Sequence, residues 1–476
     1  MGTKIAVALV AAALGAGLVS GVAEAAPART AVPDGVRDSV DYLVGTYGVT
    51  EQEALRRLDL QRSAVALDGA LRGSTAYGGM YLDQEAGGVL VVQATKTAAV
   101  EPFLARLPDR AHVRTKVVRN SLASLRATEA RISAQVGAGP DAVYLPAVSE
   151  RDNKVVVWER GWVKQTSLTA GAEDAKARAA VAAQPDVEVR PLALPTPYST
   201  PNVDWGYCHP LYCTQHGPWR GGLRLDVQRD NGTWGGCTSG FNLRSSGGGF
   251  PGKAWVLTAG HCVVGKTNNT PIRHNGVGVV NQHGIEKNAY PYDYAALGYL
   301  TQADENSWLN SQTGHNRVLK YCRNGGTDSN ADTPCGAQAT STDELITGIH
   351  PLADVKAGWV VCASGSGSNA TNYPDSVDSG SGVGYLPGTR CGRVLSTDVG
   401  INTDLCARPG DSGSPLFSQV DHTALGILEG SLQSRGGACW AGEQNNYVPI
   451  DTILEELDAR IAGQGSTFTV ITTATG

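Results

Sequence analysis

The chain has 476 residues, 18 % of them charged, and a formal net charge of −6 at pH 7. This length allows two or more domains, and so small a net charge gives no reason to expect nucleic acid or an anionic membrane surface as a partner. Glycine and cysteine are unevenly spread: 17 of the 59 glycines fall in residues 1–200, and all ten cysteines lie in residues 201–476. Segments of such different composition predict separate domains.

Residues 1–25 have the pattern of a secretory signal peptide. Lys4 precedes the apolar run IAVALVAAALGAGLV, and Ala23-Glu24-Ala25 follows as an A-x-A cleavage pattern. The alternative, a transmembrane anchor, is disfavoured because the run is short and interrupted by glycine and serine. We therefore expect a secreted, extracellular protein with no membrane partner. In an oxidising exterior an even number of cysteines predicts disulfides. Neither a C-x-x-C pair nor an H-x-x-x-H spacing, which would predict a metal site, occurs in the sequence. No metal or cofactor is therefore expected.

Residues 26–200 predict a compact α+β unit. Thr50-Glu51-Gln52-Glu53 has the capping-box form and predicts a helix start, followed by apolar residues on or near one face: Leu55, Leu58, Val65 and Leu71. The stretch 77–94 predicts two strands joined by a Gly87-Gly88 turn. A second helix is predicted over 121–136 and a strand over 154–160. After Arg190 a proline-rich stretch without periodicity predicts a linker and a domain boundary.

Residues 201–450 predict an all-β domain. Short apolar runs alternate with clusters of glycine, asparagine and serine, and almost no helical period occurs. The end differs, because Ile450, Ile453, Leu454, Leu457 and Ile461 have the spacing of an amphipathic C-terminal helix.

Three stretches of this part carry candidate catalytic residues, in the order His, Asp, Ser. They are WVLTAGHCV (255–263) with His261, YPYDYAALGYL (290–300) with Asp293, and RPGDSGSPLF (408–417) with Ser412. This order is that of chymotrypsin-like proteases, whereas subtilisins and α/β-hydrolases have other orders. Any one stretch alone would predict only a turn or a strand edge. Their combination in a secreted all-β domain predicts a serine protease.

Each residue type has a chemical role in that prediction. A serine hydroxyl is a poor nucleophile, so neutral His261 must accept its proton and later protonate the leaving amine. Asp293 would hold the Nδ1–H of that imidazole and stabilise its charged form. The N–H groups of Gly410 and Ser412 would bind the oxyanion, and Gly413 would allow a tight turn.

Residues 205–460 resemble the bacterial secreted chymotrypsin-like proteases of the streptogrisin and α-lytic protease family. The resemblance rests on GGCTSGF (235–241), TAGHC, CGRV (391–394) and CARPGDSGSPLF (406–417), and region 40–190 resembles that family's pro-region. It implies an all-β fold of two six-stranded barrels with a C-terminal helix, preceded by a signal peptide and an α+β pro-region. It also implies disulfides Cys237–Cys262, Cys362–Cys391 and Cys406–Cys439, leaving Cys208–Cys213 and Cys322–Cys335 as local pairs.

The sequence departs from that family in three places. ASGSG follows Cys362 where an arginine would pair with Asp411, so no partner of Asp411 is predicted. The loop between Cys362 and Cys391 carries the insertion SNATNYPDSVDSGSGVGYLPG. The edge strand beside the substrate has Glu429 in place of the usual serine, followed by Gly430. The resemblance makes Ala407, Glu429 and Gly430 the specificity pocket; small Ala407 favours aromatic or long apolar side chains, while a charged Glu429 would favour Lys or Arg.

The predicted organisation is therefore a signal peptide over 1–25, a pro-region over 26–200 that helps folding and inhibits, and a protease domain over 201–476. The partners expected are protein or peptide substrates and the chain's own pro-region, and we expect a monomer that is cut within 191–206. The alternative is a catalytically silent protease homologue that acts as a binding module.

Overall fold

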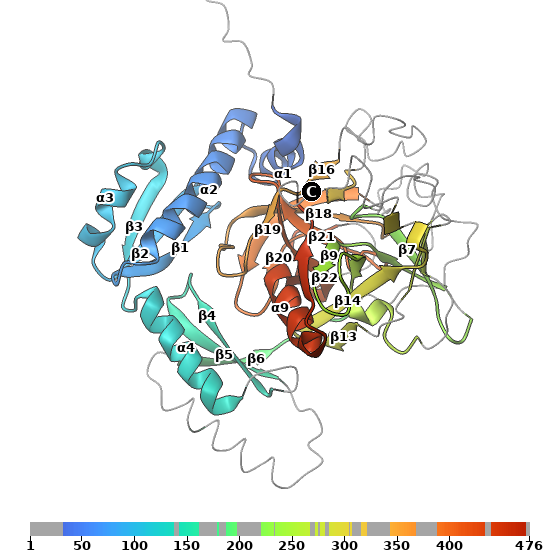
Figure 1. Cartoon of the computed structure of the whole chain (residues 1–476). Coiled ribbons are helices and arrows are strands. Elements are labelled where there is room, and N and C mark those ends of the chain that lie inside the picture. Colours follow the sequence, from blue (N-terminus) through green and yellow to red (C-terminus); the bar gives the residue numbers. More distant parts are fainter. Residues whose placement is uncertain are drawn as a thin grey trace, which may run out of the picture.

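The computed structural model describes residues 32–137, 142–160, 187–197, 220–266, 285–306, 316–320, 343–367, 388–433 and 439–472, and the short stretches 272–274 and 277–280, with residues 233 and 304 left out and residue 179 isolated. The predicted signal peptide, the predicted pairs Cys208–Cys213 and Cys322–Cys335, and the inserted stretch 368–387 lie outside these residues. Figure 1 shows an N-terminal part of helices and small sheets beside a larger β-rich part.

The N-terminal part begins with helices α1 (Arg37–Tyr47) and α2 (Glu51–Leu71). The predicted helix start is confirmed, because the Thr50 side chain accepts a hydrogen bond from the Glu53 N–H at 3.2 Å, while the Glu53 carboxylate pairs with Arg56 and Arg57. On α2, Leu58 and Leu71 are buried, while Leu55 and Val65 are half-buried. Strands β1 (Tyr77–Asp83) and β2 (Val89–Ala94) form the predicted hairpin, and β3 (Val113–Val117) joins β2 in parallel after the short helix α3 (Glu101–Leu104).

The same order of elements occurs a second time. The predicted second helix, α4 (Leu122–Val136), precedes the antiparallel strands β4 (Tyr144–Ser149) and β5 (Lys154–Arg160), and β6 (Val187–Leu192) joins β5 in parallel. Pro191 and Leu192, expected in the linker, thus belong to a strand. Proline is tolerated in an edge strand such as β6, because its missing N–H can face away from the neighbouring strand. A proline-rich composition therefore does not distinguish a linker from an edge strand.

The first sheet of the β-rich part has the strand order β24-β9-β10-β14-β12-β11-β7-β8, and β13 pairs with β14. Its strands are β7 (Arg224–Gln228), β8 (Trp234–Thr238), β9 (Asn242–Ser246), β10 (Ala254–Thr258), β11 (Ile272–His274), β12 (Val277–Val280), β13 (Glu286–Ala289), β14 (Tyr292–Tyr299) and β24 (Thr467–Val470). Among the described residues no pairing joins β8 to β9. The first of the two predicted closed barrels is therefore present as an open sheet, which the C-terminal strand β24 extends at one edge.

The second sheet closes into the predicted six-stranded barrel. Its order is β22-β21-β18-β19-β20-β23, with β23 paired back onto β22 and the two-residue strand β17 (Gly348–Ile349) attached to β22. The strands are β18 (Val360–Gly365), β19 (Gly388–Ser396), β20 (Ile401–Thr403), β21 (Pro415–Ser418), β22 (Thr423–Gln433) and β23 (Gln444–Pro449). A two-stranded piece, β15 (Arg317–Val318) with β16 (Glu344–Leu345), lies outside it.

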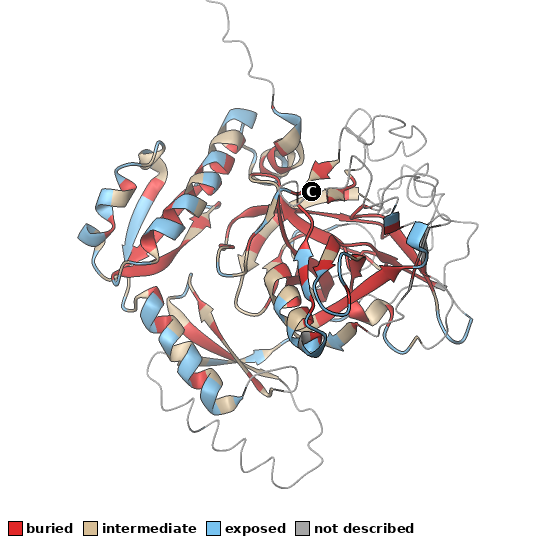
Figure 2. Ribbon diagram, viewed as in Figure 1, coloured by how far each residue is buried: buried red, intermediate tan, exposed pale blue. Residues whose placement is uncertain are grey.

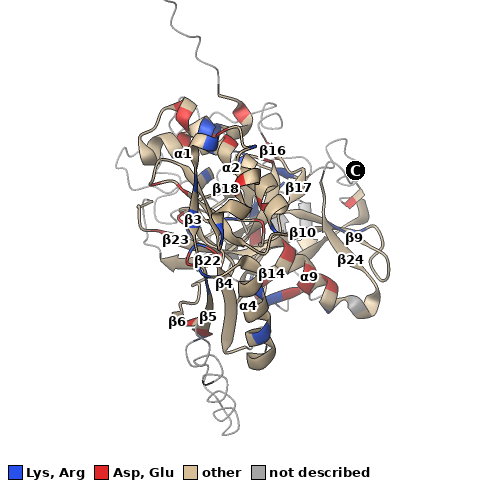
Figure 3. Cartoon of the chain, turned by 90° about the vertical axis from the view of Figure 1, so that its left-hand side faces the viewer, with Lys and Arg blue, Asp and Glu red and all other residues tan. Residues whose placement is uncertain are grey.

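The predicted C-terminal helix is α9 (Ile450–Arg460), which buries Ile450, Ile453 and Leu457 against the β-rich part. Figure 2 shows the buried residues concentrated in the sheets, with exposed residues on the outer faces of the helices. Charges of both signs surround α1 and α2, and acidic residues lie on α9 (Figure 3). Among the helices of the described residues, none is both long and apolar enough to cross a membrane.

The N-terminal part and the second barrel share a continuous apolar core. One cluster joins buried residues of α2, β1 and β2 to Val355, Trp359 and Val361 of the barrel side. Polar contacts follow the same surface: the Gln61 side chain donates to the Val360 carbonyl at 3.1 Å and accepts its N–H at 2.8 Å. Gly358 has φ +85°, and a Cβ there would lie 1.8 Å from the Leu82 carbonyl oxygen of β1. The two parts are fitted to each other at the level of the backbone.

Candidate active site

His261 and Asp293 are brought together by neighbouring strands. His261 lies in the 3-10 turn Gly260–Cys262 directly after β10, and Asp293 lies near the start of β14, which pairs with β10 in antiparallel register. One Asp293 carboxylate oxygen lies 2.6 Å from the imidazole Nδ1, and the other accepts the His261 backbone N–H at 2.7 Å. Gly260 makes this turn possible, because a Cβ there would lie 1.9 Å from the Lys287 carbonyl oxygen.

Ser412 completes the arrangement from the second barrel. It lies in the turn before β21, and its Oγ is 2.8 Å from Nε2 of His261. The three predicted residues therefore form one hydrogen-bonded chain from carboxylate to hydroxyl. Ser412 is 0 % exposed and the Asp293 side chain is 1 % exposed, while His261 is half-buried, with 9 % of its side chain exposed. Ser412 and Asp293 are thus buried, and the His261 ring between them is the most exposed of the three side chains.

Two glycines give the turn around Ser412 its shape. Gly413 has φ +84°, and a Cβ there would lie 2.3 Å from the Thr258 hydroxyl, at the end of β10. Gly410 has φ +100°, and its carbonyl accepts a hydrogen bond from the Thr238 hydroxyl at 2.7 Å. Within the described part of the chain, the N–H groups of Gly410 and Ser412 make no hydrogen bond. They are the donors that the sequence predicts for an oxyanion.

The Asp411 carboxylate is satisfied by backbone groups. It accepts the Gly367 N–H at 2.7 Å and the Arg408 N–H at 2.9 Å. The glycines of the departing stretch ASGSG explain how, because a Cβ at Gly365 or Gly367 would lie 1.9 or 2.6 Å from Asp411 atoms. The Arg408 guanidinium pairs with Glu443 at 2.5 Å, and both side chains are buried. Backbone N–H groups are thus partners of the Asp411 carboxylate, for which the sequence predicted none.

The predicted pocket residues lie in the second barrel and are buried. Ala407 is 2 % exposed in the apolar core, and Gly430 follows Glu429 on β22. The pairing of β22 with β23 shifts at Glu429, and such a β-bulge redirects a side chain. Glu429 is 5 % exposed. Burial, and next the nearby Asp293 carboxylate, raise the pKa of Glu429 well above its ordinary value, while Arg160 acts in the opposite direction. Burial therefore favours the uncharged form of the Glu429 carboxyl group.

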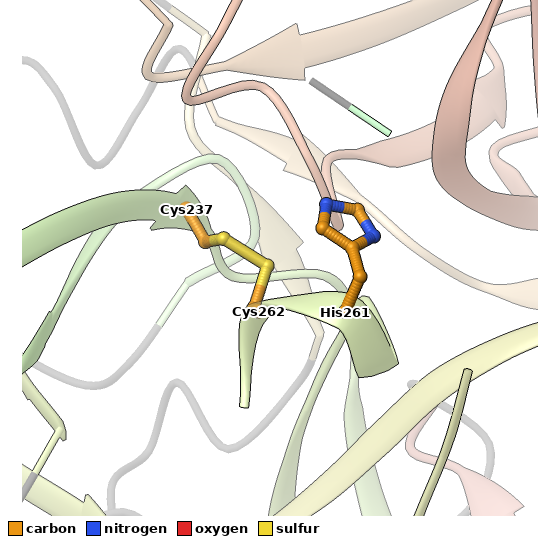
Figure 4. A group of neighbouring side chains, drawn as sticks. All are labelled: Cys237, His261 and Cys262. Carbon is orange, nitrogen blue, oxygen red and sulfur yellow. A yellow bond between two sulfur atoms is a disulfide. The ribbon is translucent and has the colours of Figure 1, made fainter. Parts of the chain in front are cut away.

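The three disulfides that the resemblance implies are present: Cys237–Cys262, Cys362–Cys391 and Cys406–Cys439. The first lies beside His261, and Figure 4 shows both sulfurs joined next to the imidazole. A sulfur in a disulfide is not a thiolate and so is a poor metal ligand, and Nδ1 of His261 is in hydrogen-bond contact with Asp293. This group of two cysteines and a histidine therefore has an explanation other than metal binding.

Three features of the site were not expected from the sequence. Thr238 fixes the Gly410 carbonyl, Arg160 of β5 donates to the Tyr290 carbonyl close to Asp293, and Thr196 pairs with Ser431 of β22. These residues are ordinary in type and far apart in sequence. No local signal could have found them.

No family model matches the sequence, and a search of curated proteins finds no match. Among solved structures, the chain is similar to the Nocardiopsis protease NAPase at 18 % identity, over 53 % of this chain and 100 % of that chain, with a TM-score of 0.31. It is similar to Thermobifida fusca protease A at 18 % identity, over 53 % of this chain and 100 % of that chain, with a TM-score of 0.29. It is similar to Cellulomonas bogoriensis chymotrypsin at 19 % identity, over 53 % of this chain and 98 % of that chain, with a TM-score of 0.28. At this level of similarity the comparisons assign neither a family nor an activity.

Proposed function

We propose that the chain is the precursor of a secreted serine endopeptidase that hydrolyses peptide bonds of proteins through Ser412, His261 and Asp293. The observation that carries the proposal is the unbroken chain of hydrogen bonds from the Asp293 carboxylate through the imidazole to the Ser412 hydroxyl, at 2.6 and 2.8 Å. These are the distances at which a base can take a proton from a nucleophile and be oriented by a third group.

The geometry supports a specific sequence of proton transfers. Asp293 accepts the Nδ1–H, so the lone pair of Nε2 faces the Ser412 hydroxyl. As Oγ attacks the substrate carbonyl carbon, its proton moves to Nε2, and the imidazolium is stabilised by Asp293. The N–H groups of Gly410 and Ser412 bind the oxyanion. His261 then protonates the leaving amine, and a water molecule repeats the steps on the acyl-enzyme.

Side chains around Ser412 favour an aromatic or long apolar residue before the scissile bond. Glu429 is buried, and burial and the nearby Asp293 carboxylate raise its pKa, which disfavours a fixed negative charge that would attract a lysine or arginine. The Ala407 side chain is small and apolar, which is compatible with a large apolar substrate side chain. Peptides with tyrosine or phenylalanine at this position should therefore be better substrates than peptides with lysine or arginine.

The N-terminal part, residues 26–200, acts in this proposal as a folding helper and inhibitor of the protease domain, residues 201–476. Its support is the shared apolar core with the second barrel and the backbone pairing of Thr196 with Ser431 of β22. Secretion is supported by the three disulfides, which persist in oxidising compartments.

The test compares Ser412→Ala with Ser414→Ala, a serine two residues further along the same turn. Ser412→Ala should lower kcat on casein by about a millionfold and abolish labelling by a fluorophosphonate, because only a triad serine is activated. Ser414→Ala should keep both. If wild-type protein that has lost its N-terminal part takes no label, the chain is the catalytically silent binding module instead.

A further inference from the structure

One carboxylate of the β-rich part, Asp354, is shared by two basic side chains from different parts of the chain. The His350 Nδ1 lies 3.6 Å from Oδ2 of Asp354. The other oxygen, Oδ1, is paired with the guanidinium of Arg72, the residue directly after α2. The same guanidinium donates to the Ala353 carbonyl at 3.1 Å. The C-terminal end of α2 is therefore attached to the segment that carries Asp354.

The His350 ring is in contact with a carboxylate at each nitrogen. His350 follows the short strand β17 and is 8 % exposed. Its Nε2 lies 2.5 Å from the carboxylate of Asp421, in the turn between β21 and β22, while Nδ1 faces Asp354. The ring also packs edge-on against Trp359, with 5.5 Å between the ring centroids. An imidazole can donate a hydrogen bond from both nitrogens only when it is protonated, so this arrangement favours the charged form.

The charge of His350 changes in a range of pH that cells and their surroundings experience. Burial lowers the pKa of His350, but the hydrogen bond to Asp421 and the charges of Asp421 and Asp354 outweigh burial and raise the pKa above its ordinary value of 6.5. The imidazole is therefore charged in mild acid and loses its charge as the solution becomes alkaline.

The other charged groups around this cluster have partners of their own. The Asp68 carboxylate of α2 accepts the Arg72 Nε–H at 2.8 Å, Asp451 at the start of α9 accepts the Leu352 N–H at 2.9 Å, Lys356 lies 2.9 Å from Glu150, and His422 is paired with Glu344 of β16. Asp354 is the carboxylate that His350 and Arg72 have in common.

Protonation of His350 and attachment of α2 oppose each other for two reasons. First, both place a positive charge beside Asp354, and two positive charges this close repel. Second, attachment buries Trp359 in the apolar core shared with α2, and burial of the neighbouring His350 ring disfavours its charged form. If attachment of α2 weakens proton binding, then proton binding must weaken the attachment by the same factor.

We propose that His350 is a pH sensor that loosens the attachment of α2 in mild acid by competing with Arg72 for Asp354. In alkaline solution the neutral imidazole leaves the Asp354 carboxylate to Arg72, and α2 is attached most firmly. In mild acid the imidazolium neutralises Asp354, and the contact to Arg72 contributes less. This inference concerns the attachment of the N-terminal part and holds whether or not the β-rich part is a protease.

The test measures hydrogen exchange of the α2 amides in the full-length chain at pH 5.5 and pH 9. Every chain carries Ser412→Ala so that it stays whole. Dividing the intrinsic exchange rate by the observed rate gives a protection factor, which removes the direct effect of pH on exchange. His350→Gln is neutral at both pH values. It should protect α2 as well as the parent at pH 9 and about 5-fold better at pH 5.5.

The expected factor is small because the Arg72 and Asp354 side chains remain 31 % and 25 % exposed, which screens their charges. Two further groups titrate in this range, His422 and Asp398. They are present in every chain of the comparison, so their contribution cancels.

Arg62 of α2 provides a matched variant for Arg72. Its guanidinium donates to the Val420 carbonyl at 3.1 and 3.2 Å, a contact that involves no carboxylate shared with a histidine. Both Arg62→Gln and Arg72→Gln should lower the protection of α2. In the Arg62→Gln chain, adding His350→Gln should still raise protection about 5-fold at pH 5.5. In the Arg72→Gln chain it should change protection at neither pH.

Equal protection of the His350→Gln chain and its parent at both pH values overturns the proposal. So does an effect of His350→Gln that persists in the Arg72→Gln chain, because the histidine would then act through another group. If His350→Gln does not fold, the two arginine variants decide alone. The protection of Arg62→Gln divided by that of Arg72→Gln should rise about 5-fold from pH 5.5 to pH 9, and a ratio that does not change with pH overturns the proposal.

Discussion

Asp293 holds His261 with both carboxylate oxygens, one on the ring and one on the backbone. The contact to Nδ1 is 2.6 Å and the contact to the backbone N–H is 2.7 Å, and the aspartate is buried. The ring and the peptide that carries it are thus fixed by the same group. A base that must not rotate during proton transfer gains from being held at two points.

Replacing Asp293 by asparagine should separate its contact to the imidazole ring from its contact to the His261 backbone. The amide oxygen can still accept one N–H, so the fold should persist, but the amide cannot stabilise an imidazolium and favours the wrong tautomer. We expect kcat to fall by about 10⁴, with a thermal midpoint within a few degrees of wild type. Loss of folding, seen by circular dichroism, would instead assign Asp293 a mainly structural role.

Gly413→Ala should remove activity by disrupting the turn itself. Both this glycine and Gly232 have positive φ, +84° and +80°, but only at Gly413 would a Cβ meet other atoms, while nothing lies within 4 Å at Gly232. Gly232→Ala should cost about 1 kcal/mol of unfolding free energy, and Gly413→Ala about 3 kcal/mol or more. Equal costs in denaturant titrations would contradict the steric explanation.

Glu150→Gln should weaken the attachment of the N-terminal part. The Lys356 ammonium lies 2.9 Å from the Glu150 carboxylate, is 2 % exposed, and has Asp68 as a second partner at 3.4 Å. Removing one charge leaves Lys356 buried and partly compensated, which costs less than a complete break. We expect separately expressed 26–200 to inhibit the protease about 10- to 100-fold less tightly. Arg37→Gln, at an exposed pair with Glu51, is the control and should change inhibition little.

Asp398 should make the folded chain less stable as pH rises. Burial, and next the Asp152 carboxylate, raise the pKa of Asp398 from 3.8 to about 6. The protonated form is the one that folding favours, so this stabilisation is complete below about pH 4 and lost as pH rises through 6. Asp398→Asn should raise the unfolding free energy at pH 7 by up to about 3 kcal/mol.

The same variant should flatten the stability curve between pH 4 and 6. It should not abolish the slope, because burial also raises the pKa of Asp343 to about 6. Asp59→Asn, at a side chain 69 % exposed on α2, is the control. Thermal midpoints measured across this range would contradict the assignment if Asp398→Asn and Asp59→Asn behaved alike.

Residues 201–476 expressed alone should remain partly folded and inactive, and adding 26–200 as a separate chain should restore activity once the helper has been degraded. The barrel pairs strands that are distant in sequence, which slows folding, and the 42 glycines of residues 201–476 increase the entropy lost on ordering. Refolding of 201–476 alone to full activity within minutes would contradict the folding role and leave only inhibition.

Local chemistry in the sequence determined the elements and the reactive residues. Thr50 and Glu53 mark a helix start, Gly87-Gly88 marks a hairpin, and the spacing from Ile450 marks the last helix, because capping, turn conformation and amphipathic period act over a few residues. His261, Asp293 and Ser412 were recognisable for the same reason, since each lies in a short stretch whose neighbours its chemistry requires.

Tertiary structure decided how these parts meet. Asp411 is satisfied by the backbone of Gly367, Gly410 is tied to Thr238, and Thr196 pairs with Ser431, 235 positions further along the chain. The open first sheet and its added strand β24 likewise depend on which edges remain unpaired once the chain has folded. A backbone N–H or carbonyl is the same in every residue, so no sequence pattern names its partner, and only the packing of distant strands determines which two groups come within hydrogen-bonding distance.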